Sequence, residues 1–167
     1  MSKDFKLINT VTLTEEATRF GITTDSEGKP FKLTEWYIEV GCYNKNEQNT
    51  NDPGWKVLRV ILNYYGTSAI GAQSVSGIDG NLGNLPNYNA NLFIKAVGKI
   101  IDLDDTDSKQ HSLVYKSIYD NFSGQSLIYS KVGRLKKKYV ESVLVATGTN
   151  PGTWLFGVGS YIKLYGK

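Results

Sequence analysis

The 167-residue sequence contains one cysteine, one histidine, one methionine and four prolines. Because Cys42 is alone, no disulfide can form within the chain, and we interpret it as a small buried apolar residue. A domain of this length needs no disulfide, since it buries roughly 70% of its unfolded surface. A single histidine, His111, excludes a metal site made from several histidines of one chain. The sequence therefore predicts neither a metal nor a cofactor.

Motifs of catalysis are also missing. There is no Gly-x-x-x-x-Gly-Lys phosphate loop, no Gly-x-Ser-x-Gly nucleophile elbow and no His-Glu-x-x-His zinc motif. A catalytic triad would have to use His111, which lies in an expected strand. Glu35 and Glu39 share a strand face but are about 13 Å apart along it, too far for a pair of glycosidase carboxylates. We predict no catalytic residues and a protein that is not an enzyme.

Charged segments are few and are best explained as solvated turns. The acidic turn 102–110 resembles a calcium loop, but the sixth and twelfth positions from Asp102 hold Asp107 and Leu113 instead of Gly and Glu. We interpret a basic cluster as part of a solvated loop or as charges that keep an edge strand from pairing with another chain, and we expect no nucleic-acid partner. That cluster is Arg134, Lys136, Lys137 and Lys138.

Long apolar runs are absent too. No stretch approaches the ~20 residues of a membrane span, so no span is predicted. Residues 1–11, MSKDFKLINTV, lack the apolar core of a signal peptide, and we expect synthesis in a cytoplasm.

What the sequence has is a β-type pattern, with 17 glycines, 11 tyrosines and segments of alternating apolar and polar residues. The expected strands are 5–13, 17–24, 31–43, 55–65, 92–101, 111–118, 138–147 and 161–165. An irregular strand around 69–75 stays open, 119–131 is ambiguous, and a helix over 108–121 is the alternative to the sixth strand. About eight strands separated by turns predict one all-β domain over 1–167, an antiparallel, jelly-roll-like β-sandwich.

The segment 31–43 is the clearest central strand. Its first face is apolar and is predicted to lie in the core, whereas Glu35, Tyr37, Glu39 and Gly41 form a face that is wet or covered by a partner. The predicted core consists of Trp36, Ile38, Val40, Leu58, Val60, Leu62, Leu144, Ile162 and Leu164.

Aromatic and amide side chains gather in or beside the two longest loops, 44–54 and 66–91. Sugars bind by stacking an apolar ring face on an aromatic side chain and by donating and accepting hydrogen bonds. The candidate ligand-binding residues are Trp55, Tyr64, Tyr65, Asn81, Asn84 and Tyr88. The alternative is that these aromatic side chains pack beneath their own loops.

Three stretches carry a family resemblance: FKLINTVTLTEEATRFGITT at the start, FKLTEWYIEVGCYN with GWKVLRVILNYYG in the middle, and VESVLVATGTNPGTWLFGVGSYIKLYGK at the end. In order and spacing they resemble the small β-sandwich appendage domains of tailed bacteriophages, found in tail-fibre, baseplate and head-fibre proteins. Residues 102–131 depart from the pattern.

The resemblance implies a non-enzymatic virion component that binds a host cell-surface carbohydrate, contacts other virion proteins and forms a homo-oligomer, with a trimer expected. It carries over no fixed set of binding residues. Two alternatives stay open: a structural or decoration protein of the virion without a ligand, and a free bacterial carbohydrate-binding module.

Overall fold

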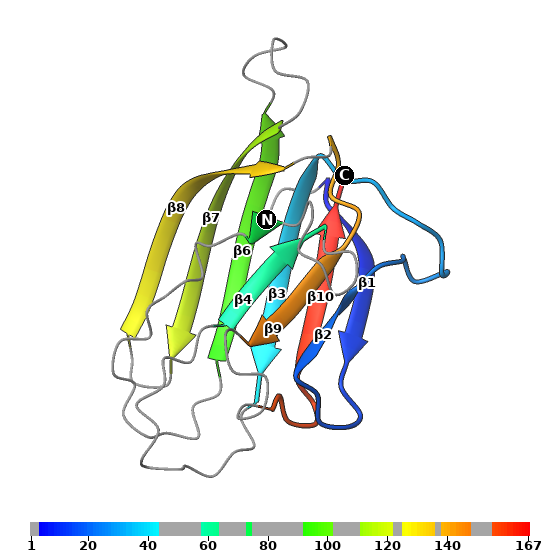
Figure 1. The fold of residues 1–167 in the computed structure, drawn as a ribbon, viewed down its shortest axis with the longest axis vertical. Coiled ribbons are helices and arrows are strands. Elements are labelled where there is room, and N and C mark those ends of the chain that lie inside the picture. Colours follow the sequence, from blue (N-terminus) through cyan, green and yellow to red (C-terminus); the bar gives the residue numbers. More distant parts are fainter. Residues whose placement is uncertain are drawn as a thin grey trace.

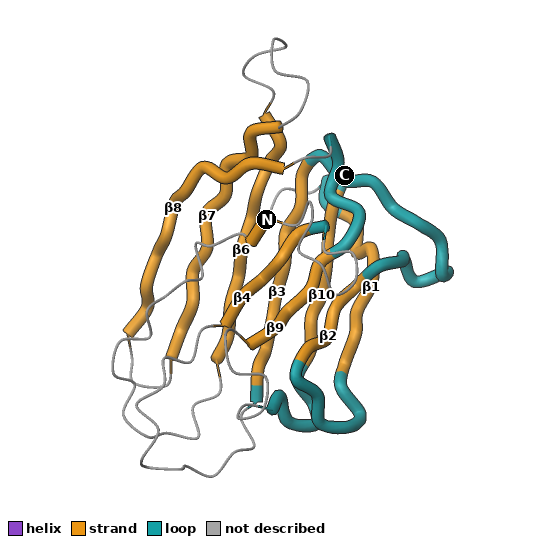
Figure 2. Tube along the Cα trace, viewed as in Figure 1, coloured by secondary structure: helices purple, strands orange, loops and turns teal. Residues whose placement is uncertain are grey.

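The computed structural model describes residues 4–43, 58–63, 73–74, 92–101, 111–121, 125–135, 138–147 and 155–167. Within these residues the chain forms ten strands in two antiparallel sheets (Figures 1 and 2). The same residues contain no helix, and so none that is long and apolar enough to cross a membrane.

The larger sheet has six strands. In spatial order they are β1 (Lys6–Thr12), β10 (Tyr161–Gly166), β3 (Glu35–Cys42), β6 (Leu92–Ile101), β7 (His111–Asn121) and β8 (Gln125–Leu135).

The smaller sheet has four strands. In spatial order they are β2 (Arg19–Ile22), β9 (Val143–Thr147), β4 (Leu58–Leu62) and β5 (Gln73–Ser74).

The connections between the sheets are those of a jelly roll. The first four strands alternate between the larger and the smaller sheet, and the last two strands then insert between them: β10 lies between β1 and β3, and β9 between β2 and β4. In each sheet a strand from the C-terminal part of the chain thus pairs with two strands from the N-terminal part. The prediction of an all-β antiparallel sandwich with a jelly-roll-like arrangement is confirmed.

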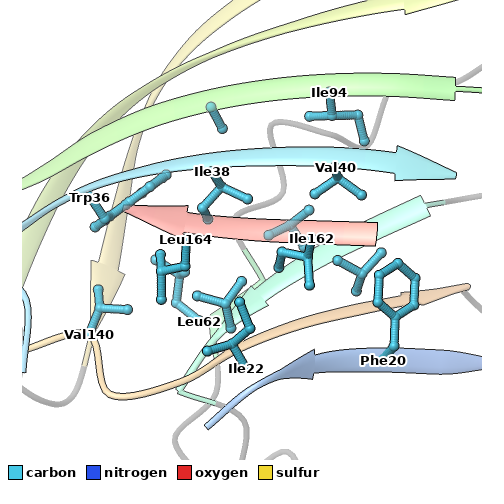
Figure 3. Packing of buried hydrophobic residues seen from close by; sticks show 14 of the residues in the cluster. Phe20, Ile22, Trp36, Ile38, Val40, Leu62, Ile94, Val140, Ile162 and Leu164 are labelled. Carbon is cyan, nitrogen blue, oxygen red and sulfur yellow. The ribbon is translucent and has the colours of Figure 1, made fainter. Parts of the chain in front are cut away.

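The core lies between the two sheets (Figure 3). Trp36, Ile38 and Val40 of β3 and Ile162 and Leu164 of β10 point from the larger sheet, as predicted, and all five are at most 1% exposed. The smaller sheet supplies further buried side chains, of which two were predicted. They are Phe20, Ile22, Val60, Leu62, Val143 and Val145.

One predicted core residue is wrong. Leu144 is only partly buried, and its neighbours Val143 and Val145 face the core instead. The expected strand 138–147 placed Leu144 on the same face as Val140. In the structure Val140 forms only an isolated bridge with Leu33 and the regular strand begins at Val143, so Leu144 does not share the buried face of Val140. The side chain of Leu58 lies outside the described residues, but its register places it on the same strand face as Val60.

Strand pairing settles three segments that the sequence left open. The alternative of a helix over 108–121 is wrong, since His111–Asn121 is β7, paired along its whole length with β8. The ambiguous 119–131 ends β7 and begins β8, a strand of eleven residues that the alternation did not predict. The open segment 69–75 contains the short β5.

Candidate functional site

The six ligand-binding residues predicted in or beside the long loops are not among the described residues. They are Trp55, Tyr64, Tyr65, Asn81, Asn84 and Tyr88.

The frame beside the first of these loops is described. Tyr43, the last described residue before 44–57, donates its backbone N–H to Ser160 Oγ at 3.0 Å and accepts a hydrogen bond from Gly157 N at 2.7 Å. Its ring meets that of Phe93 edge to face, with 6.3 Å between centroids. The turn before β10 therefore anchors the start of this loop.

The described residues present a second candidate on the outer face of the larger sheet. We define the outer face as the side of β1, β10, β3 and β6 that points away from the smaller sheet. Because residues opposite each other in an antiparallel pair share a face, the register identifies its members. They are Leu7, Thr10, Thr12, Glu35, Tyr37, Glu39, Gly41, Phe93, Lys95, Val97, Lys99, Tyr161, Lys163 and Tyr165.

An aromatic and apolar row crosses this face. Leu7, Tyr165, Tyr37 and Val97 are successive cross-strand neighbours, so the row spans four strands and about 14 Å. The rings of Tyr37 and Tyr165 are tilted by 45° with 5.4 Å between centroids. Leu7 is 55% exposed and Val97 is 44% exposed, so apolar surface is open to water at both ends of the row. We call these four residues the aromatic row.

The hydroxyl of Tyr37 is held by a carboxylate on the same strand. It donates a hydrogen bond to Glu39 Oε1 at 2.6 Å. Partial burial, followed by this hydrogen bond and the negative charge of Glu39, raises the pKa of Tyr37 above its usual value. Burial and the charge of Glu39 also raise the pKa of Tyr161. Both phenols are therefore neutral donors at ordinary pH.

Charged rows border the aromatic row on both sides. On one side Glu35 lies between Lys99 and Lys167, with 3.3 Å from a carboxylate oxygen to each ammonium group. Burial acts to raise the pKa of Glu35, but the hydrogen bonds and charges of the two lysines outweigh it and hold this pKa below the usual value. On the other side the register places Glu39 between Lys163 and Lys95.

A glycine makes room for the third tyrosine of the outer face. A Cβ atom on Gly41 would lie 2.4 Å from Cε1 of Tyr161, so the ring of Tyr161 lies over the backbone of β3 where any other residue would collide with it. The Nζ atom of Lys163 is 5.5 Å from the centroid of the same ring. Tyr161 therefore lies flat enough on the sheet to continue its aromatic surface beyond the charged row.

The two carboxylates of the outer face are each engaged by neighbouring side chains. The hydroxyl of Tyr37 holds Glu39, and the ammonium groups of Lys99 and Lys167 hold Glu35. Cys42 is buried on the opposite face of β3, and burial raises the pKa of its thiol. No group of three or more His, Cys, Asp or Glu side chains that could hold a metal ion occurs in the described part of the chain.

No protein-family model and no curated protein matches the chain. Among solved structures, peanut lectin with a nine-residue peptide is similar over 99% of this chain and 87% of its own, with 13% identity and a TM-score of 0.37. A seed lectin of Lotus tetragonolobus is similar over 98% of this chain and 87% of its own, with 14% identity and a TM-score of 0.36. The binding domain of botulinum neurotoxin serotype G is similar over 98% of this chain and 42% of its own, with 10% identity and a TM-score of 0.24. Scores this far below 0.5 establish neither a family nor a ligand for this chain.

Part of the outer face was visible in the sequence. The polar alternation of 35–41 marked a face that is wet or covered by a partner, and Tyr37 is on it. The same alternation in Tyr161, Lys163 and Tyr165 was equally readable. The missing signal was adjacency: no local pattern says that β10 lies beside β3, more than 120 positions away in the chain.

Proposed function

We propose that the protein is a non-enzymatic carbohydrate-binding component of a tailed-phage virion, and that it attaches to a glycan on the host cell surface. The observation that carries the binding function is the aromatic row with charged residues on both sides. A pyranose has an apolar C–H face that covers exposed aromatic and aliphatic surface, while its hydroxyls form hydrogen bonds with neighbouring carboxylates and ammonium groups. The outer face offers both kinds of partner within a few ångströms of each other.

The shape of the surface favours an extended ligand. The aromatic row runs across four strands, so it supports contacts along a chain of sugars rather than around a single one. Exposed leucine and valine side chains at its two ends lengthen the apolar strip. A polysaccharide that lies along the row would cover it completely.

The phage part of the proposal comes from the sequence resemblance. It implies a virion location, contacts with other virion proteins and a homotrimer. A single flat sugar site binds at about millimolar dissociation constants, and three linked sites raise the overall affinity well above that. Light scattering at tens of micromolar protein tests the trimer, and a monomer mass would refute it. Neighbouring genes for tail or capsid proteins separate a virion component from a free bacterial binding module.

Binding of the whole protein to a glycan array and to wall polysaccharides of the host tests the function. Tyr37→Ala with Tyr165→Ala is expected to abolish binding through the outer face. Tyr37→Phe keeps the ring and is the matched control. Because both tyrosines are half-buried, melting temperatures must accompany the binding data, and Leu7→Ser with Val97→Ser shortens the same row at exposed positions.

The outcomes separate the two candidate sites. Loss of binding in Trp55→Ala and Tyr88→Ala, with binding intact in the outer-face variants, would assign the glycan to the long loops instead. Wild-type protein that binds nothing on the array and no wall polysaccharide would reject carbohydrate binding and leave the structural virion role.

A further inference from the structure

The four lysines of the two charged rows are not equally engaged. Lys99 and Lys167 both contact the carboxylate of Glu35. Lys95 and Lys163 flank Glu39 in the register, but no ion pair among the described residues includes either of them. One charged row is therefore neutralised in part by its own carboxylate, and the other keeps two ammonium groups that are free of ion pairs with the described residues.

Two contacts engage Glu39 and Lys163 with tyrosines rather than with each other. One oxygen of Glu39 accepts the hydrogen bond of the Tyr37 hydroxyl at 2.6 Å. The ammonium group of Lys163 lies over the ring of Tyr161 instead, 5.5 Å from its centroid. A cation over an aromatic face keeps its outer N–H donors directed to solvent, where a ligand can meet them.

The free ammonium groups lie beside the aromatic row. Lys95 precedes Val97 by two positions along β6, and Lys163 precedes Tyr165 by two along β10, which is about 7 Å in each case. A sugar ring stacked on Tyr37 and Tyr165 would thus carry its substituents to within reach of both lysines. A negatively charged substituent on the side of the sugar ring that faces Lys95 and Lys163 loses part of its hydration on binding. Two charge-assisted hydrogen bonds from these lysines compensate for that loss.

Building on the proposed function, we propose that the outer face selects an acidic polysaccharide, whose carboxylate or phosphate groups bind Lys95 and Lys163 while its sugar rings lie along the aromatic row. The net charge of the two charged rows agrees, since four lysines stand against two glutamates. Carboxylates and phosphates form the same charge-assisted hydrogen bonds with lysine, so polysaccharides that contain uronic acids and those that contain sugar phosphates both fit the proposal.

Two other occupants fit the surface less well. A second copy of the chain would bring two faces of the same net positive charge together, which costs free energy. A single-stranded nucleic acid carries one negative charge at every nucleotide, and the carboxylates of Glu35 and Glu39 stand on the central strand directly beside the row that its bases would have to cover.

A matched pair of polymers tests the proposal. Polygalacturonate and its fully methyl-esterified form differ in charge but not in sugar backbone. Calorimetry on the whole protein at low ionic strength should give at least about tenfold tighter binding to the acidic polymer, because two ammonium contacts are added. Lys95→Gln with Lys163→Gln should remove this preference, because it weakens the binding of the acidic polymer more than that of the esterified one. Lys32→Gln with Lys138→Gln changes the charge equally at exposed positions off the outer face and should keep the preference.

Each contrary result has its own meaning. Equal affinity for the two polymers, or equal losses in the two double variants, would overturn selection of acidic chains and leave carbohydrate binding intact. The same holds if the protein binds only neutral sugars on the glycan array. Tighter binding of a thymidine oligonucleotide than of polygalacturonate would overturn the proposal in favour of nucleic acid. A preference for phosphorylated over uronate-containing sugars on the array would support it and identify the source of the anion.

Discussion

Asn63 follows β4 in a left-handed backbone conformation with φ of 58°, and its side chain is 1% exposed. Its Nδ2 donates to the carbonyl of Tyr139 at 2.9 Å, and its Oδ1 accepts from Glu141 N at 2.7 Å. One residue thus turns the chain at the end of β4 and ties it to the segment that leads into β9. Asparagine tolerates this conformation better than other residues with a Cβ atom.

Substitutions at Asn63 should separate the backbone from the side chain. Asn63→Gly keeps the conformation but leaves two partly buried backbone groups without partners, at about 2–3 kcal/mol of unfolding free energy. Asn63→Ala loses the same bonds and adds the strain of a left-handed alanine, about 1–2 kcal/mol more. Urea unfolding measures both variants. Equal stabilities would mean that the left-handed conformation contributes nothing.

Tyr37 should make stability fall in alkaline solution. Its pKa is raised in the folded state by burial and by Glu39, whereas the unfolded phenol loses its proton near pH 10. The folded state then binds the proton more tightly, so this contribution is present below about pH 10 and is lost as the pH rises further. Urea unfolding from pH 9 upward should show a steeper loss in the wild type than in Tyr37→Phe, which has no phenol to titrate. Parallel curves would contradict this interpretation.

At the scale of elements, the free edge of β1 is covered by the turn that follows β2. Ser26 N donates to the carbonyl of Ile8 at 2.9 Å. A bulge between Leu7 and Asn9 places the amide of Asn9 against the carbonyls of Thr24 and Asp25, at 2.9 and 3.1 Å. These bonds occupy part of an edge that would otherwise offer free backbone groups to another chain.

Asn9→Ala should therefore loosen this turn. The variant loses the two hydrogen bonds that the amide donates to Thr24 and Asp25 and the one that its Oδ1 accepts from Thr10 N, and we expect a cost of about 1–2 kcal/mol. The amide of Ser26 should exchange with deuterium faster, because the turn no longer holds it against Ile8. Thr10→Ala, at an exposed position of the same strand, is the control. An unchanged exchange rate at Ser26 would show that the backbone bond alone holds the turn.

The strands that alternation predicted and those it missed differ in their surroundings. β3 and β10 lie in the middle of the larger sheet and bury one face only, so apolar and polar residues alternate clearly. β9 begins after an irregular step at Glu141 and Ser142, and four consecutive residues from Val143 are apolar, so its phase was ambiguous. β8 is the edge strand of the larger sheet (Figure 1) and contacts the two-residue β5 of the smaller sheet, which is too short to impose a uniformly apolar face on it.

At the scale of the whole molecule, the candidate surface depended on information that no single segment contains. Each of the three strands β10, β3 and β6 shows a mixed polar face in the sequence. Only their pairing aligns Tyr165, Tyr37 and Val97 in one row and brings Glu35 between two lysines. Such pairings join distant parts of the chain, so composition could suggest aromatic side chains for a ligand but could not assemble them.

The two sheets share one core, and this leads to the last prediction. Ile38 of the larger sheet and Val60 of the smaller sheet are 0% and 1% exposed, within the same cluster of buried residues. If the chain folds as one domain, damage to either sheet must destabilise both. Ile38→Ala should cost about 2–5 kcal/mol and Val60→Ala roughly 1–3 kcal/mol.

Both variants should lower a single melting transition, by about 2–4 °C for each kcal/mol. Tryptophan fluorescence, to which the buried Trp36 contributes, and far-UV circular dichroism should report the same midpoint in each variant. Thr12→Ala, at an exposed position of β1, should leave that midpoint unchanged. Two separate transitions, or a Val60→Ala shift seen by only one probe, would mean that the sheets unfold independently. The smaller sheet would then not hold the larger sheet in a fixed shape, and the spacing between the aromatic row and the charged rows would not depend on it.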